Sequence, residues 1–322
     1  MTTQADKDAL LARLTKIQSV GGSLLSNATA AKKLAEAIDV ADPAPDPVPD
    51  PVPEPTPEPT PDPDPVPAGG FPDATNTGVP AGVALAPYTG PARITTPTVI
   101  DGKDITVPLV IARSAGTVTI RNSRSRCEAY WNILNDEGAT LVLEDVELDG
   151  MGNPANDCAV AGYNKTIRRC NIHGTIDGLK IGSNDIVEDT YIHDLTVTAD
   201  SHNDGMQSLG SDDVLIRHNT VIMRDGATSA ILLSTGSADS MKRIRIEDNL
   251  LGGGAFTVYG GYEAGRDVLS RVSDVSITGN RITTTVFPRG GAYGPFTSVD
   301  APAVAMSANV WHDGPNAGQP AS

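Results

Sequence analysis

The sequence predicts an all-β solenoid of parallel strands, preceded by a short helical segment and a proline-rich linker. Three observations support this fold: short apolar strands that recur in register, asparagines that recur at one turn, and a run of alternating prolines ahead of both. The expected boundaries are 1–41 for a helical docking or oligomerisation segment, 42–70 for the linker, and 71–322 for the solenoid with a C-terminal cap.

The N-terminal segment has a helical pattern. Residues 6–39 place apolar side chains at a mostly three-and-four spacing, interrupted by Gly21-Gly22, which predicts two helical pieces. Helices this short cannot bury an apolar stripe alone, so we expect them to self-associate into a homo-oligomer or to dock on a partner protein. An undocked amphipathic tail is the alternative interpretation.

The linker is built from proline and acidic residues. Every odd-numbered residue from Pro43 to Pro67 is proline, and seven acidic residues lie between Asp42 and Asp64 without any Lys or Arg. Such a stretch favours an extended polyproline II spacer of roughly 75 Å, at about 3.1 Å per residue. A ligand for an SH3-type domain is the alternative, although the basic anchor typical of those motifs is absent.

The third segment contains internal repeats. Seven short segments align with one apolar residue in register, at spacings of 23, 24, 20, 29, 30 and 31 residues: Ile120, Leu143, Ile167, Val187, Ile216, Ile246 and Ile277. Six of them carry a second apolar residue five positions later: Leu148, Ile172, Ile192, Val221, Leu251 and Ile282. Strands that recur in this way indicate a β-solenoid, here of about seven to nine coils. Residues 283–308 follow the last clear repeat, and we expect a loop that leads to the cap.

One polar column accompanies the apolar ones. Asn219, Asn249 and Asn280 occupy the same position of successive repeats, and Cys170 and Thr190 precede them. Asparagines stacked about 4.8 Å apart can hydrogen-bond to one another and to the turn backbone. We interpret this column as a structural ladder.

Composition excludes several classes of protein. The formal net charge of -16, with no Lys/Arg stripe, argues against a nucleic-acid partner. Three cysteines, Cys127, Cys158 and Cys170, are too few and too irregular for a disulfide framework or a four-ligand zinc site, and buried free thiols are expected. The N-terminus lacks the pattern of a signal peptide, and no stretch approaches the ~20 apolar residues of a membrane span.

Three aspartates form the candidate catalytic site. Asp157, Asp177 and Asp204 each precede a strand group, and spacings of 20 and 27 residues predict carboxylates stacked on successive coils. Stacking should raise at least one pKa, and a two-carboxylate hydrolase is chemically feasible. His202 would point the same way as Asp204 and assist it. In the alternative interpretation Asp-Gly is ordinary turn chemistry, repeated because the fold repeats.

Two further sets of residues are candidates for binding. Asp149, His173 and His193 follow the second apolar column and could hold a divalent metal or be solvated surface residues; we assign no metal and no cofactor. The large aromatic side chains in or beside the repeats could stack on sugar rings or pack in the core. They are Tyr130, Trp131, Tyr163, Tyr191, Tyr259 and Tyr262.

The repeats resemble right-handed parallel β-helix proteins of the pectate-lyase-like superfamily. The flanks FPDATNTGVPAGVALAPYTGP at 71–91 and NVWHDGPNAG at 309–318 resemble segments of β-helix proteins encoded by actinobacteria and their phages. The helical segment and proline spacer, without a signal peptide, are most similar to a minor tail protein of an actinobacteriophage. The catalytic motifs of pectate lyases and polygalacturonases are absent, and HNDG at 202–205 matches only part of one.

This resemblance implies a function. We expect a minor tail protein of the virion, made in the host cytoplasm, that attaches to other tail proteins through residues 1–41 and contacts a cell-surface polysaccharide of the host. The alternative is a glycan-degrading hydrolase or lyase that uses the stacked aspartates. A cell-associated bacterial adhesin is a third reading.

Overall fold

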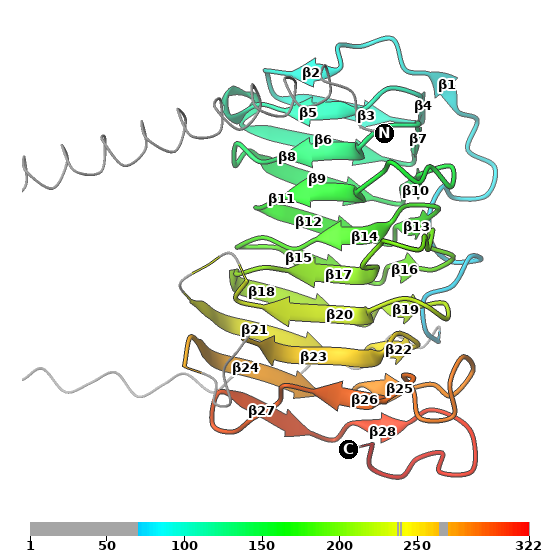
Figure 1. Ribbon diagram of the computed structural model, residues 1–322. Coiled ribbons are helices and arrows are strands. Elements are labelled where there is room, and N and C mark those ends of the chain that lie inside the picture. Colours follow the sequence, from blue (N-terminus) through cyan, green and yellow to red (C-terminus); the bar gives the residue numbers. More distant parts are fainter. Residues whose placement is uncertain (1–69, 237, 239, 264–269, 322) are drawn as a thin grey trace, which may run out of the picture. The chain divides into compact units, whose positions relative to one another are not determined.

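The computed structural model describes residues 70–321 apart from 237, 239 and 264–269. The expected helices of 1–41 and the linker up to residue 69 lie outside the described residues. The described chain is a parallel β-solenoid in which each coil contributes short strands to three sheets, A, B and C, that run the length of the stack (Figure 1). One 3-10 turn, η1 (Arg113–Ala115), interrupts the coils near the N-terminal end.

The three sheets take their strands in chain order. Sheet A contains β1 (Ala86–Pro87), β4 (Lys103–Ile105), β7 (Arg124–Arg126), β10 (Glu147–Asp149), β13 (Asn171–His173), β16 (Tyr191–Ile192), β19 (Thr220–Ile222), β22 (Leu250–Gly252), β25 (Arg281–Ile282) and β28 (Val310–Trp311). Sheet B contains β2 (Arg93–Ile94), β5 (Leu109–Ile111), β8 (Trp131–Asn135), β11 (Cys158–Gly162), β14 (Asp177–Lys180), β17 (Asp204–Ser208), β20 (Ser229–Ser234), β23 (Phe256–Tyr262) and β26 (Gly294–Thr297). Sheet C contains β3 (Thr98–Asp101), β6 (Thr117–Arg121), β9 (Thr140–Glu144), β12 (Lys165–Arg168), β15 (Ile186–Glu188), β18 (Asp212–Arg217), β21 (Met241–Glu247), β24 (Val272–Thr278) and β27 (Val304–Ser307).

Both predicted apolar columns are confirmed. The first lies in sheet C, where Ile120 pairs with Leu143 and the register continues without a break to Ile277. The second lies in sheet A, from Leu148 to Ile282. All these side chains are buried, so the two columns form much of the core. Cys127, Cys158 and Cys170 are buried free thiols, as expected.

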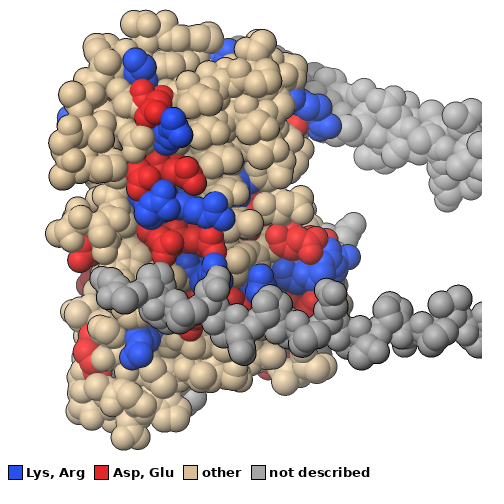
Figure 2. All heavy atoms as spheres, turned by 180° about the vertical axis from the view of Figure 1, so that it is seen from behind, with Lys and Arg blue, Asp and Glu red and all other residues tan. Residues whose placement is uncertain are grey.

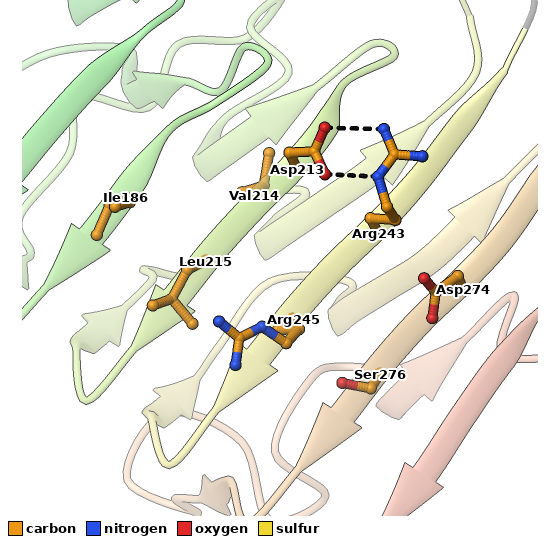
Figure 3. Close-up of a pocket in the computed structure, with 8 residues that line it drawn as sticks. All are labelled: Ile186, Asp213, Val214, Leu215, Arg243, Arg245, Asp274 and Ser276. Carbon is orange, nitrogen blue, oxygen red and sulfur yellow. Dashed lines mark hydrogen bonds and ion pairs between the residues drawn. The ribbon is translucent and has the colours of Figure 1, made fainter. Parts of the chain in front are cut away.

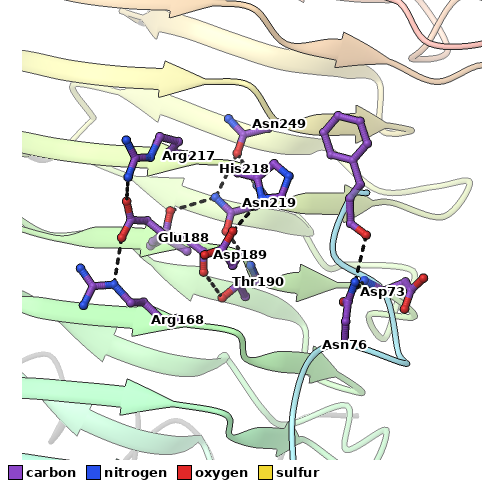
Figure 4. Close-up of polar contacts among 12 residues, drawn as sticks. Asp73, Asn76, Arg168, Glu188, Asp189, Thr190, Arg217, His218, Asn219 and Asn249 are labelled. Atoms are coloured by element: carbon purple, nitrogen blue, oxygen red, sulfur yellow. Dashed lines mark hydrogen bonds and ion pairs between the residues drawn. The ribbon is translucent and has the colours of Figure 1, made fainter. Parts of the chain in front are cut away.

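The asparagine ladder is also confirmed, and it holds the corner between sheets C and A (Figure 4). The amide nitrogen of Asn219 donates to Oδ1 of Asn249 at 2.9 Å, and that of Asn249 donates to Asn280 at 2.9 Å. Asn309 extends the ladder by one step that the sequence alignment missed. Each ladder residue follows a residue with positive φ, such as Asp248 at 54°, which turns the chain sharply between the two sheets.

Charges of opposite sign alternate along the outer face of sheet C (Figure 2). Register partners run in the order Asp101, Arg121, Glu144, Arg168, Glu188, Arg217 and Glu247. Glu188 accepts hydrogen bonds from Arg168 at 2.9 Å and Arg217 at 2.6 Å. If a strand paired with the strand two coils away instead of its neighbour, charges of the same sign would lie opposite each other. The alternating column therefore favours the observed pairing of the coils.

A buried ion pair lies where sheet B turns into sheet C. The side chains of Lys165 and Asp185 have no exposed surface, and their charged groups are 2.5 Å apart. The ammonium also donates to the backbone oxygens of Gly162 and Lys180, and Gly182 N donates to the carboxylate at 2.7 Å. Every charged hydrogen-bonding group of the pair thus has a partner, which is the condition under which a buried pair is tolerated.

The C-terminal region differs from the prediction. Residues 283–308 were expected to form a loop, but β26 joins sheet B and β27 joins sheet C, so the coil repeat continues. The repeat was hidden because a long turn separates β25 from β26 and because Pro295 and Phe296 replace the usual β-branched pattern. The described residues include no helix with the length and apolar character that a membrane crossing requires.

Candidate functional site

Two of the three candidate aspartates are stacked in sheet B. Leu179 of β14 pairs with Met206 of β17, a register that sets Asp177 beside Asp204 on the next coil. The backbone amide of Asp204 donates to Oδ1 of Asp177 at 2.8 Å. Asp177 therefore performs the backbone-bonding role expected of a structural aspartate, and it also places its second oxygen in a polar network.

Lys180 and Gln207 complete that network. The ammonium of Lys180 contacts Asp177, lies 3.3 Å from Oδ1 of Asp157, and donates to Oε1 of Gln207 at 2.8 Å. The amide nitrogen of Gln207 donates in turn to Oδ2 of Asp204 at 2.9 Å. One cation therefore links two carboxylates directly and reaches the third through an amide.

The carboxyl group of Asp204 is fully buried, and its pKa is raised as a result. Its side chain has no exposed surface, and Ser229 donates to its Oδ1 at 2.5 Å. Burial, followed by repulsion from Asp177, raises the pKa of Asp204 to about 7. Burial also raises the pKa of Asp177, against the attraction of Lys180. The expected repulsion between stacked carboxylates is thus the second cause of the pKa shift of Asp204, after burial.

The third aspartate and the histidine lie elsewhere than predicted. The register partner of Asp177 in β11 is Cys158, so Asp157 is one residue out of the stack. Its backbone oxygen accepts from the amide of Asp177 at 2.8 Å, but its carboxylate reaches the stack through Lys180. His202 is exposed in the turn before β17 and makes no hydrogen bond or ion pair among the described residues. The expected contact between His202 and Asp204 was wrong because Asn203 folds inward and the partners of Asp204 are Gln207 and Ser229.

An open groove of about 490 Å³ lies over this network. Asp157, Lys180 and Gln207 line it with polar groups, and the apolar part of its lining is Ile181, Leu209, Gly210 and Ala238. The side chains of Asp157 and Lys180 are 28% and 26% exposed, so a ligand in the groove can reach them. Asp204 lies beneath Gln207 and has no exposed atoms.

Aromatic rings follow the groove on the same outer face of sheet B. Lys180, Gln207, Leu232 and Tyr259 are successive register partners on neighbouring coils. The ring of Tyr259 lies edge to face with Phe256 and Tyr262, with centroids 5.7 and 6.2 Å away, and Tyr293 lies 5.8 Å from Phe256. Tyr262 and Tyr293 are 43% and 68% exposed. We call Phe256, Tyr259, Tyr262 and Tyr293 the aromatic cluster.

The candidate binding residues of sheet A form a separate group. The ring of Tyr191 stacks on His193 at 4.0 Å, and the rings of His173 and His193 are 5.4 Å apart. Nε2 of His193 bonds to Asn171 at 2.8 Å and its Nδ1 to Asp194 at 2.7 Å. Burial lowers the pKa of His193, whereas a hydrogen bond to Glu147 raises that of His173. These contacts occupy the ring nitrogens that a metal would need.

No metal site is found in the described part of the chain. No group of three or more His, Cys, Asp and Glu side chains there is arranged to hold an ion. Asp149, the third member of the suggested set, lies 3.1 Å from Arg126 and accepts a hydrogen bond from the backbone of Met151. Tyr163 lies in the turn between β11 and β12, where its ring packs against Gly138. Neither residue borders the groove of sheet B.

A second groove, of about 440 Å³, lies on the outer face of sheet C (Figure 3). Asp213 and Arg243 on its wall form a two-bond ion pair, and Arg245, on the same strand as Arg243, extends toward Leu215. Ile186, Val214, Leu215, Asp274 and Ser276 complete the lining. None of the residues singled out from the sequence lies here.

Sequence reasoning missed several residues of the sheet B site. Lys180, Gln207 and Ser229 contact the stacked aspartates, and Phe256 and Tyr293 complete the aromatic cluster. A signal for two of them was present, because Asp177-Gly-Leu-Lys180 and Asp204-Gly-Met-Gln207 both place a long polar side chain three residues after the aspartate.

Comparisons with known proteins support the fold. No protein-family model matches the chain. No curated protein matches it either. Among solved structures, the crystal structure of the periplasmic alginate epimerase AlgG is similar, with a TM-score of 0.51 and 13% sequence identity. The match covers 66% of this chain and 49% of that one, so it spans about half the length of the epimerase. The chain therefore shares a parallel β-solenoid fold with this epimerase.

Proposed function

We propose that this chain is a phage minor tail protein whose right-handed solenoid contacts a glycan of the host envelope through the outer face of sheet B. The observation that carries the glycan proposal is the register of Lys180, Gln207, Leu232 and Tyr259, which sets a polar groove and the aromatic cluster along one line. Three steps of about 4.8 Å separate the first residue from the last, so the line extends roughly 14 Å.

This combination suits a sugar chain. Aromatic rings stack on the apolar faces of sugars, a neighbouring carboxylate accepts hydrogen bonds from sugar hydroxyls, and a side-chain amide both donates hydrogen bonds to them and accepts from them. The alginate epimerase of similar fold is named for action on a polysaccharide, which is in keeping with a glycan ligand. The assignment to a virion tail rests on the sequence resemblance of the flanks and on the helical pattern and proline run predicted from the N-terminal sequence, through which we expect attachment to other tail proteins.

Retention on immobilised envelope polysaccharide tests the binding proposal. The host class implied by the resemblance supplies the probe, a polysaccharide fraction from actinobacterial cell walls. We expect the chain to be retained and Tyr259→Ala with Tyr262→Ala to lose most of that retention. Tyr191→Ala, which removes a tyrosine from sheet A, is the matched control and should bind normally. Equal retention of all variants would show that the aromatic cluster is not the contact.

A second candidate is a glycan-degrading hydrolase or lyase that uses Asp204 and Asp177. The observation in its favour is the pKa of about 7 for Asp204, which suits a general acid at neutral pH. The observation against it is that Asp204 has no exposed surface, so Gln207 would have to move before a substrate could reach it. Release of oligosaccharides by the parent chain but not by folded Asp204→Asn would favour the enzyme over the binding protein.

A further inference from the structure

We propose that the sheet B groove selects uncharged glycans and rejects polyuronates. This inference rests on the proposed function and names the chemical class of its ligand. It runs against what the similar fold of an alginate epimerase would suggest, because alginate is a polyanion. The reasons lie in the charges of the groove and in the hydrogen bonds of its cations.

The first reason is that the ammonium of Lys180 is already paired with two carboxylates of the chain. A lysine ammonium carries three N–H groups. Lys180 donates hydrogen bonds to Asp177 and, at 2.8 Å, to Oε1 of Gln207, and its ammonium forms an ion pair with Oδ1 of Asp157 at 3.3 Å. A sugar carboxylate at Lys180 would therefore compete with the carboxylates of Asp177 and Asp157 for the same positive charge.

The second reason is that the other cation near the groove is also paired. Nη1 of Arg271 donates to the backbone oxygen of Ala238, a lining residue, at 3.1 Å. Nε of Arg271 lies 3.5 Å from a carboxylate oxygen of Glu263. Among the described residues, therefore, both cations at the groove already face a carboxylate.

The third reason is an excess of acid groups. Asp157 and Asp177 contact the single ammonium of Lys180, and Asp204 is linked to it through Gln207. Asp157 is the one of the three carboxylates that reaches solvent. A uronate in the groove would lie within a few ångströms of Asp157, where like charges repel. Hydroxyl groups meet no such repulsion. They can use the carboxylate of Asp157 and the carbonyl and amide of Gln207, while their rings stack on Tyr259 and Tyr262.

Affinity electrophoresis of the full chain through gels that contain soluble polysaccharides tests the proposal. The uncharged probes are galactomannan, arabinogalactan stripped of uronic acid, and dextran; the charged probes are alginate and polygalacturonate. We expect at least one uncharged probe to retard the protein with an apparent dissociation constant tenfold or more below that of either polyuronate.

A charge variant sharpens the test. Asp157→Asn removes the exposed carboxylate but leaves Lys180 paired with Asp177, so polyuronate binding should strengthen several-fold while binding of the uncharged probe changes less than twofold. Asp101→Asn on sheet C makes the same change in net charge away from the groove and should alter neither. Tighter binding of polyuronates by the parent would overturn the inference and leave a glycan-binding function standing. Retardation by no probe, with no retention on envelope polysaccharide, would overturn both.

Discussion

Replacing Asp204 by Asn should stabilise this protein at alkaline pH, although the change alters a buried hydrogen-bonded residue. The pKa of Asp204 is about 7 in the fold, whereas the ordinary value for an aspartate is 3.8. Between these values the unfolded chain releases a proton that the folded chain retains. The stabilising contribution of Asp204 is therefore fully present below pH 3.8 and is lost as the pH rises through 7.

The size of the effect follows from the shift. A difference of about 3 pKa units at about 1.4 kcal/mol per unit gives a loss of roughly 4 kcal/mol between pH 4 and pH 8. Asn carries no charge and avoids this loss. The Asn side chain keeps an oxygen that accepts from Ser229, but its amide group presents an N–H toward the amide nitrogen of Gln207. The hydrogen bond lost there costs about 1 kcal/mol of unfolding free energy. The net gain for Asp204→Asn at pH 8 is about 3 kcal/mol.

Urea unfolding of parent and variant at pH 4, 6 and 8 measures this gain. The free energy difference between them should grow with pH in favour of the variant. Asp185→Asn is the matched control, because it also neutralises a buried aspartate but leaves Lys165 as an unpaired buried cation, and it should destabilise the protein at every pH. If Asp204→Asn is less stable than the parent at pH 8, or the difference does not depend on pH, the assigned environment of Asp204 is incorrect.

Three further predictions concern the fold. Lys165→Met should cost about 3–5 kcal/mol in urea unfolding, because Asp185 would remain buried without its cation; a cost below 1 kcal/mol would contradict the pairing. Asn249→Ala should cost about 3 kcal/mol in the same assay, because it leaves the amide groups of two neighbouring coils without partners, and an unchanged midpoint would refute the ladder. Gly205→Ala should lower the melting temperature through a loss of about 1–3 kcal/mol, because an added Cβ would lie 2.3 Å from Cγ1 of Val221; a neutral result would show that the core there is loosely packed.

Sheets A and C could be predicted from the sequence because their inward positions are large and aliphatic. A residue such as Ile167 pairs with Leu143 and Val187, and the five-residue step to Ile172 crosses one sharp corner of constant length. The asparagine ladder could be predicted because it lies in that same corner of constant length. Asn309 was missed because its coil lacks the aliphatic residue that anchored the alignment; Met306 and Trp311 stand in the two columns instead.

Sheet B was harder to predict because its inward positions include very small residues and its flanking turns vary in length. Gly178 and Gly205 fill core positions where a Cβ would meet Ile192 and Val221. Sheet B also has a buried apolar column that the repeat alignment did not pick out, which consists of Ile133, Val160, Leu179, Met206, Ile231 and Val258. The 20-residue spacing from Asp157 to Asp177 suggested a shared register, but turns of different length displace the first aspartate by one position. Register in sheet B is therefore set by turns that a periodicity search does not resolve.

The claim that the outer face of sheet B contacts glycan is tested most directly by a crystal structure of the chain with oligosaccharides released from actinobacterial envelope polysaccharide. The account predicts sugar density along the line from Lys180 to Tyr259, with at least one ring stacked on Tyr259 or Tyr262. Sugar bound instead in the sheet C groove beside Arg243, or against Tyr191 and His193 of sheet A, would contradict it.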